Sequence, residues 1–181
     1  VFTTDHGEYM GEHGLMEKNN LYESVYHIPC VISMPWKNIQ ERRCNTWINV
    51  VDFAPTLAGM LGIPYPFKVQ GKDLSTHLLE NRETEQVLYI HPSDVPRAGI
   101  LTPEFELAYV GKGWCEEEFH DHILFDMRKD PLQMTNVFGK PEYAKVQKML
   151  TEKLKRHFEE IGTPKKFLPK EVWTVEEKDG N

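Results

Sequence analysis

The chain has 181 residues and a formal net charge of −7, with 21 Lys and Arg against 28 Asp and Glu. Hydrophobic residues make up 40% and charged residues 27%, a balance typical of a globular protein with a core, which excludes a disordered or collagen-like chain. The acidic charge argues against a broad nucleic-acid-binding surface, and no apolar run approaches the ~20 residues that span a bilayer.

The first third of the chain predicts short elements around a polar loop. Residues 1–4 are β-branched or aromatic and indicate the end of a strand, and the glycine-rich residues 5–18 indicate a loop with a function. A short helix is expected over residues 19–27, capped by Asn19 or Asn20. The apolar residues 28–34 then predict a buried strand that begins at Pro29.

The middle of the chain predicts a second helix and several strands. The helix is expected to begin around residue 50 and to stop at Gly62, with Asp52 as its N-cap and Pro55 in its first turn. Its shared apolar face is expected to hold Leu57, Met60 and Leu61. Residues 63–75 form a connection rich in proline and glycine, and strands are expected at 87–91, 107–110 and 122–127, with a turn at 130–131.

A long amphipathic helix is expected near the end of the chain, from about Pro141 to a stop at Gly162. Its apolar residues recur at helical spacing, and they are Val146, Met149, Leu150, Leu154, Phe158 and Ile161. The other face is charged, which predicts a surface helix packed on a small sheet. The Lys- and Glu-rich residues after Pro164 are expected to be loosely held.

Asp5 and His6 lie where the first strand is expected to end, and ligands collect at such edges of open α/β sheets. An adjacent carboxylate and imidazole can reach one divalent ion if the backbone turns sharply, and Gly7 permits such a turn. The alternative is a helix-capping Asp beside a solvent-exposed His. A three-residue motif by itself does not decide between them.

Two further residues of the loop are candidates for binding an anion. Lys18 has a compact charge on a flexible stem and is suited to an oxyanion, although it can equally be a solvated residue before a helix. His13 can contact a substrate or orient the loop. Beside a metal, Lys18 would gather the negative charge that develops on a sulfuryl or phosphoryl group.

The motifs of this chain resemble those of a known family. TDHG, MGEHG, Lys18 and the segment HIPCVISMP occur in the order and spacing of the second signature block of the type I sulfatases, which belong to the alkaline-phosphatase-like superfamily. NVVDFAPTLAGMLGIP, QGKDLSTHLL and HILFDMRKDPLQMTNV resemble three later segments of the same family. The resemblance covers residues 1–162.

The resemblance implies an α/β fold: the C-terminal part of an alkaline-phosphatase-like sandwich, followed by a small antiparallel sheet with a C-terminal helix. Residues 1–80 would belong to the catalytic α/β domain, 81–165 to a small α+β subdomain and 166–181 to a tail. Asp5 and His6 match two neighbouring ligands of the active-site Ca²⁺, and Lys18 matches the lysine that contacts sulfate. Many members have Asn in place of His6, and Ca²⁺ prefers oxygen ligands, so the identity of the metal is left open.

Family members also use a formylglycine made from Cys or Ser in a C-x-P-S-R or C-x-A-S-R sequence. Cys30, Cys44 and Cys115 do not lie in such a sequence, and their spacing shows no CxxC pair. We therefore expect a C-terminal portion of a sulfatase, without the nucleophile and the first acidic metal ligands, that does not hydrolyse sulfate esters alone.

The expected activity is hydrolysis of a sulfuric ester, with a sulfated glycan as one possible substrate and the missing N-terminal part of the same protein as a partner. One alternative is a phosphatase, phosphodiesterase or phosphonate hydrolase of the same superfamily, and another is a non-catalytic module that kept the fold. The sequence makes no prediction about cellular location or oligomeric state.

Overall fold

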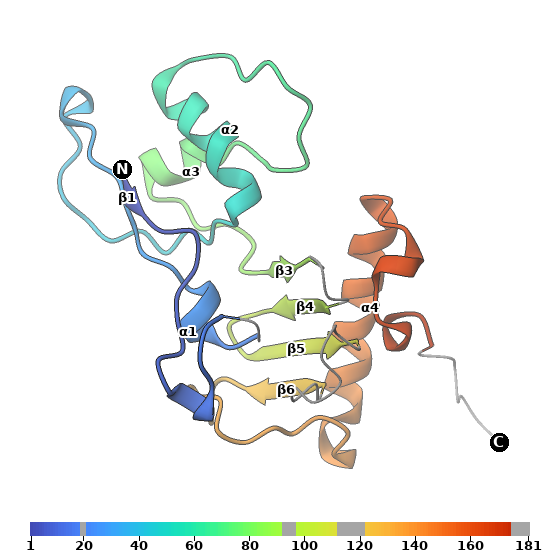
Figure 1. The fold of residues 1–181 in the computed structure, drawn as a ribbon. Coiled ribbons are helices and arrows are strands. Elements are labelled where there is room, and N and C mark those ends of the chain that lie inside the picture. The colour runs from blue at the N-terminus through green and yellow to red at the C-terminus, as the bar shows by residue number, and fades with distance from the viewer. Residues whose placement is uncertain (19–20, 92–96, 112–121, 175–181) are drawn as a thin grey trace. The chain divides into compact units, whose positions relative to one another are not determined.

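The structure is a computed structural model that describes residues 1–18, 21–91, 97–111 and 122–174 (Figure 1). The chain divides into two compact units, Val1–Arg43 and Cys44–Asn181, called the N-terminal and C-terminal units below. The division that the sequence predicts near residue 80 stays a prediction.

The N-terminal unit contains a short antiparallel pair of strands, β1 (Phe2–Thr3) and β2 (Cys30–Val31). The expected strand at the start of the chain is confirmed. The second strand is shorter than predicted and both of its residues are exposed, with Val31 at 60%. The expectation of a buried strand is wrong, because β1 offers β2 only two residues to pair with and, among the described residues, this sheet has just these two strands.

Helix α1 (Glu23–Tyr26) is shorter than the predicted helix over residues 19–27. It is preceded by Tyr22, whose backbone is extended with φ −119° and ψ 152°, and whose ring packs on His13. Tyr22 is the N-cap, and its carbonyl accepts the N–H of Val25 at 3.0 Å, so the helix begins after it. The two asparagines expected as caps lie outside the described residues.

In the C-terminal unit, helix α2 (Val50–Leu61) begins at the predicted place and ends at Gly62 with φ 69°, as predicted. Its N-cap is Asn49, so the assignment of Asp52 as the cap is wrong. Asp52 is the third helical residue, where its carboxylate accepts the backbone N–H of Asn49 at 3.1 Å. Pro55 therefore lies beyond the first turn, and Leu61 is 55% exposed instead of sharing the buried face with Met60.

Hydrogen bonds from the backbone of the connection at 63–75 hold it to α2. NVVDFAPT and QGKDL, two segments that resemble the sulfatase family, therefore share one structural role. Asp52 accepts the N–H of Lys72 at 2.8 Å, and the Thr56 hydroxyl accepts the N–H of Leu74 at 3.0 Å. Gly71 is needed for the approach, since a Cβ there would lie 1.8 Å from the carbonyl oxygen of Val51. A helix that the sequence did not predict, α3 (Ser75–Glu80), follows directly.

An antiparallel sheet follows, in which the four strands among the described residues have the order β3-β4-β5-β6 (Figure 1). The strands are β3 (Leu88–Ile90), β4 (Arg97–Leu101), β5 (Phe105–Val110) and β6 (Ile123–Asp126). The predicted strands at 87–91, 107–110 and 122–127 are confirmed, whereas β4 was not predicted. It pairs with β5 along its whole length and closes a hairpin through Thr102, whose hydroxyl accepts the N–H of Phe105 at 3.0 Å.

Helix α4 (Ala144–Glu160) packs on the sheet, as the sequence predicts, and Gly162 follows it with φ 73°. Leu150, Leu154 and Phe158 are buried, but Met149 is 48% exposed, which corrects its place in the apolar stripe. Each helical residue turns by about 100°, so Leu150, Leu154 and Phe158 form a face that extends toward Thr151, and Met149 lies on the opposite side of Leu150. Thr151 is buried instead, and its hydroxyl bonds with the Tyr109 hydroxyl at 2.7 Å.

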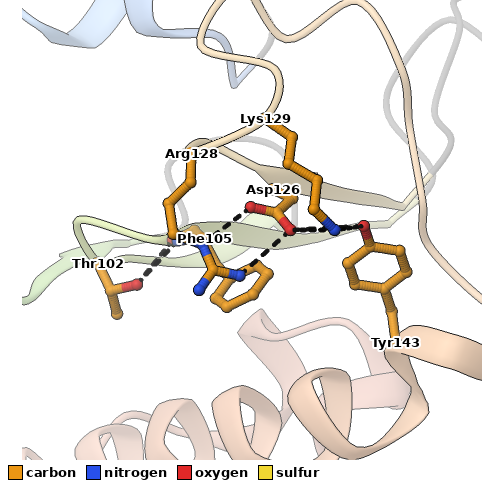
Figure 2. Close-up of polar contacts among 6 residues, drawn as sticks. All are labelled: Thr102, Phe105, Asp126, Arg128, Lys129 and Tyr143. Atoms are coloured by element: carbon orange, nitrogen blue, oxygen red, sulfur yellow. Dashed lines mark hydrogen bonds and ion pairs between the residues drawn. The ribbon is translucent and has the colours of Figure 1, made fainter.

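Ion pairs stabilise the turn after β6 (Figure 2). The Asp126 carboxylate, whose side chain is 3% exposed, accepts the Arg128 guanidinium at 3.1 and 3.2 Å and lies 3.3 Å from the Lys129 ammonium. Arg128 also lies over the Phe105 ring, 4.7 Å from its centroid. HILFDMRKDP resembles a segment of the sulfatase family, and these contacts give it a structural role, because they join the sheet to the residues before α4.

The residues after Pro164 are better held than the sequence predicts. Two 3₁₀ turns at Lys165–Phe167 and Lys170–Val172 carry Leu168 and Val172 into the core, at 5% and 0% exposure. The expectation of a loose tail is therefore wrong for residues 165–174, because two apolar side chains among the lysines pack against the α4 core.

Candidate functional site

The loop 5–18 is folded back on itself by backbone hydrogen bonds. The N–H of Tyr9 donates to the carbonyl of Glu17 at 3.0 Å, and the N–H of Gly11 donates to the carbonyl of Leu15 at 2.9 Å. Gly11 has φ 96°, a conformation that favours glycine. The two bonds reverse the chain direction, so residue 18 returns to the side of residue 6, which follows β1.

Gly7 fixes the other end of this loop against the α1 backbone. Its N–H donates to the carbonyl of Val25 at 2.7 Å, and a Cβ at this position would lie 1.9 Å from the carbonyl oxygen of Ser24. No side chain fits in that space. The glycine of the DHG motif is therefore required by a close approach of two backbone segments, which places Asp5 and His6 just before the contact.

Three of the predicted site residues meet at this point. The Lys18 ammonium lies 2.7 Å from His6 Nε2, and Asp5 Oδ2 lies 3.5 Å from the same nitrogen. His6 Nδ1 lies 2.7 Å from the carbonyl oxygen of Gly7. A carbonyl only accepts and an ammonium only donates, so this pair of contacts requires the proton on Nδ1 and a lone pair on Nε2. That tautomer is the one in which Nε2 can bind a metal.

The Asp5 carboxylate is held in its charged form. Its pKa is lowered from the usual value, first by a hydrogen bond from its own backbone N–H, and further by hydrogen bonds from the Thr4 hydroxyl and the His6 N–H. The His6 N–H donates to Oδ1 at 3.0 Å. Oδ2 is thus the oxygen that faces the imidazole, and it carries negative charge at neutral pH.

The donor set of Asp5 and His6 fits part of a site for a divalent cation. Two donors that each lie about 2.4 Å from one ion, at a right angle, are about 3.4 Å apart, close to the 3.5 Å between Oδ2 and Nε2. Within the described ranges, no group of three or more His, Cys, Asp or Glu residues is placed to hold a metal. This chain therefore offers a carboxylate and an imidazole, and a complete site would need ligands beyond them.

His13 does not join this group in the structure. Its ring stacks on Tyr22, with centroids 4.0 Å apart and planes 15° apart, and Tyr22 also meets the ring of Tyr9 edge-on at 6.0 Å. His13 has φ 54°, so it forms part of the turn at the end of the loop. Sequence reasoning singled out His13 but not Tyr22, because no local pattern indicates which aromatic residue a loop side chain will pack on.

Two further histidines, His91 and His157, lie close together in the C-terminal unit. His157 on α4 stacks on Tyr89 of β3 with ring centroids 3.7 Å apart, and its Nε2 lies 3.1 Å from Nε2 of His91. Burial, together with the nearby His91 and Lys72, lowers the pKa of His157 to about 4. Burial also lowers the pKa of His91. Both rings pack against Phe158, which indicates a structural role for His91.

A cavity of about 300 Å³ lies at the start of α4, between Tyr109, Lys140, Gln147 and neighbouring residues. It contains none of the residues that the sequence predicts as ligands. Several of its polar groups bond to one another: the Gln147 amide oxygen accepts the N–H of Gly139 at 3.0 Å, and the hydroxyls of Tyr109 and Thr151 bond to each other. The cavity is therefore not associated with the candidate site.

Comparison with known proteins decides the family. Residues 11–160 match the family described as N-sulphoglucosamine sulphohydrolase, C-terminal. The chain belongs to this family. An N-acetylglucosamine-6-O-sulfatase of Bacteroides thetaiotaomicron is 35% identical over 167 residues, which cover 85% of this chain and 29% of that protein. The match confirms the resemblance to the type I sulfatases that the sequence motifs carry.

Solved structures agree with the assignment of this chain to the sulphohydrolase family. A protein solved in complex with its substrate, D-glucosamine-2-N,6-O-disulfate, is 28% identical with a TM-score of 0.69, over 88% of this chain and 34% of that one. The phosphonate monoester hydrolase of Agrobacterium radiobacter is 26% identical with a TM-score of 0.67, over 85% of this chain and 33% of that one. The expected fold class is confirmed, and the chain spans about a third of the length of these proteins.

Proposed function

We propose that this chain forms the C-terminal part of a sulfatase and supplies two ligands of its metal, Asp5 and His6, and one contact to the sulfate, Lys18. The observation that carries the proposal is the convergence on His6 Nε2 of the Lys18 ammonium, at 2.7 Å, and of Asp5 Oδ2, at 3.5 Å. Membership of the sulphohydrolase family supports it.

Each residue has a distinct part in this proposal. Asp5 contributes charge to the cation, and His6 contributes a neutral nitrogen whose orientation is set by the Gly7 carbonyl. A bound divalent ion, for which Ca²⁺ is the expected choice, would polarise the sulfate oxygens. Lys18 neutralises the charge that grows on those oxygens, and its three N–H donors suit a tetrahedral anion. His13 stays a candidate for contact with the rest of the substrate.

The nucleophile is expected to be a formylglycine outside these 181 residues, and so are the remaining metal ligands. We propose that the missing N-terminal part of the same protein completes the site. These 181 residues alone should therefore not turn over an aryl sulfate.

Within the described residues, no helix combines the length and the apolar character needed to span a bilayer.

The proposed substrate is a sulfated amino sugar within a glycan. Two similar proteins support this choice, one named for 6-O-sulfated N-acetylglucosamine and one solved with a disulfated glucosamine. The similarity to a phosphonate monoester hydrolase favours a phosphonate or phosphate ester as the second candidate. The two classes differ in the charge and ester linkage that Lys18 and the cation would contact.

The metal site is tested by titrating Ca²⁺ into the full-length protein in a calorimeter. The Asp5→Ala variant should lose at least tenfold in affinity, since loss of a group that only orients a metal ligand already costs about 10–100-fold. Glu8→Ala is the matched control, because it removes an exposed carboxylate from the same loop. Equal affinities for both variants would contradict the assignment of Asp5.

The activity is tested by offering the full-length protein matched sulfate and phosphonate esters. We expect hydrolysis of the 6-sulfate of a glucosamine derivative at a higher kcat/KM than that of an aryl phosphonate. A preference for the phosphonate would overturn the sulfatase proposal and favour the second candidate.

A further inference from the structure

The contact between Lys18 and His6 has a consequence for how the site binds its ligands. His6 Nδ1 carries the proton that is donated to the Gly7 carbonyl, so Nε2 has a single lone pair. The Lys18 ammonium points a donor at that lone pair from 2.7 Å. A cation bound to Nε2 needs the same electrons, and one lone pair cannot serve both.

We infer that Lys18 and the metal ion compete for His6 Nε2, so that metal binding releases Lys18 from His6 and frees it to contact the anion. The inference rests on the proposed metal site and adds an order of events to it. The lysine protects the imidazole lone pair until a cation arrives. Lys18, once released from His6, would be free to bind the anion, and this would couple metal loading to capture of the sulfate.

The loop keeps the released side chain close to the site. The backbone bond from Tyr9 to Glu17 fixes the residue next to Lys18, so its Cα cannot leave when the ammonium does. The Lys18 side chain is exposed, and its flexible four-carbon stem lets the charge move while the backbone stays in place. His6 cannot rotate to avoid the competition, because the Gly7 carbonyl holds its other nitrogen.

Charge repulsion alone would also make a lysine weaken metal binding, so the test must separate the hydrogen bond from the charge. Lys18→Met and Lys18→Gln both remove the charge, but only glutamine can still donate an N–H to Nε2. Competition for the lone pair therefore predicts that Lys18→Met binds Ca²⁺ more tightly than Lys18→Gln. Repulsion alone predicts equal affinities.

The experiment is calorimetric titration of Ca²⁺ alone into the full-length protein and its variants. We expect Lys18→Met to bind about two- to tenfold more tightly than Lys18→Gln, the range that one modest hydrogen bond supplies. With ¹⁵N-labelled histidine, the Nε2 resonance of His6 should shift in Lys18→Met without metal, and in the wild type when Ca²⁺ is added. This NMR readout needs no turnover.

The possible outcomes separate this inference from the proposed function. Equal affinities of Lys18→Met and Lys18→Gln, with Asp5→Ala still impaired, would overturn the competition and leave the metal site standing. An unchanged affinity in Asp5→Ala would overturn both. A wild-type Nε2 resonance that does not respond to Ca²⁺ would also refute the competition, whatever the variants do.

Discussion

The two units of the chain differ in what holds their residues in place. In the described part of the N-terminal unit, Tyr9 and Val25 are the buried apolar side chains, and the loop is shaped by backbone hydrogen bonds. The C-terminal unit encloses a cluster that includes Leu107, Leu154 and Phe158 at 0% exposure. The candidate chemistry therefore lies where backbone geometry positions the side chains, whereas resistance to unfolding comes from the packed sheet and helix.

Truncating the core of the C-terminal unit should have the largest effect. Leu150→Ala removes a side chain that is 1% exposed, and should lower the free energy of unfolding by about 3–5 kcal/mol because it leaves a cavity. Met149→Ala is the control on the neighbouring position, where 48% exposure predicts a change of about 0.5 kcal/mol or less. Urea unfolding measures both, and similar losses would contradict the observed face of α4.

Removing the charge of Asp126 should have an intermediate effect. Asp126→Asn keeps the shape but weakens the bonds to Arg128 and Lys129, and should cost about 1–3 kcal/mol in unfolding free energy at pH 7. The pKa of Asp126 is lowered, first by its hydrogen bond from Arg128, so the stabilisation is present above the unfolded value of 3.8 and is lost as the pH falls below it. Unchanged stability at pH 7 would show that solvent screens these bonds.

A change at Gly7 should affect the site more than the stability. Gly7→Ala places a Cβ against the Ser24 carbonyl and should displace Asp5 and His6, with about a tenfold loss of Ca²⁺ affinity (~1.4 kcal/mol) in the full-length protein. Gly14→Ala is the control, because no atom lies within 4 Å of a Cβ there, although its φ of 72° adds some strain. Equal losses in both variants would mean that loop conformation, and not the close approach at Gly7, is responsible.

The smallest expected effect is a dependence on pH. Because the pKa of His157 is lowered to about 4, the native state binds fewer protons than the unfolded state between pH 4 and the usual 6.5. Stability should therefore decrease as the pH falls from about 6.5 to about 4. His157→Gln removes the titrating ring and should make this decrease shallower, as measured by urea unfolding at pH 7 and pH 5. Equal slopes in the wild type and the variant would contradict this prediction.

Helix α4 illustrates what can be predicted from sequence. Its apolar residues recur over many turns, so their spacing is enough to assign Leu150, Leu154 and Phe158 to the buried face. Strand β4 was missed because residues 97–101 are a short run with a glycine at its centre, and its pairing with β5 depends on the hairpin at Thr102. Short elements carry little local signal, and their partners decide whether they form.

The candidate site, like the fold, could be predicted from the sequence only in part. The residue types Asp5, His6 and Lys18 are identified from the motif, but the motif does not state that the lysine meets Nε2 of the histidine. That contact depends on the bond between Tyr9 and Glu17. His13, placed in the same loop by sequence, packs on an aromatic residue instead.

The sequence by itself determined the order of the motifs, the amphipathic face of α4 and the residue types available for chemistry, because these depend on local spacing along one chain. Only the tertiary structure decided that Gly7 faces a carbonyl, that Lys18 reaches His6, and that Asp52 holds the Lys72 N–H as well as the N–H of Asn49. Those outcomes depend on hydrogen bonds and close approaches between residues distant in sequence, which no local pattern specifies.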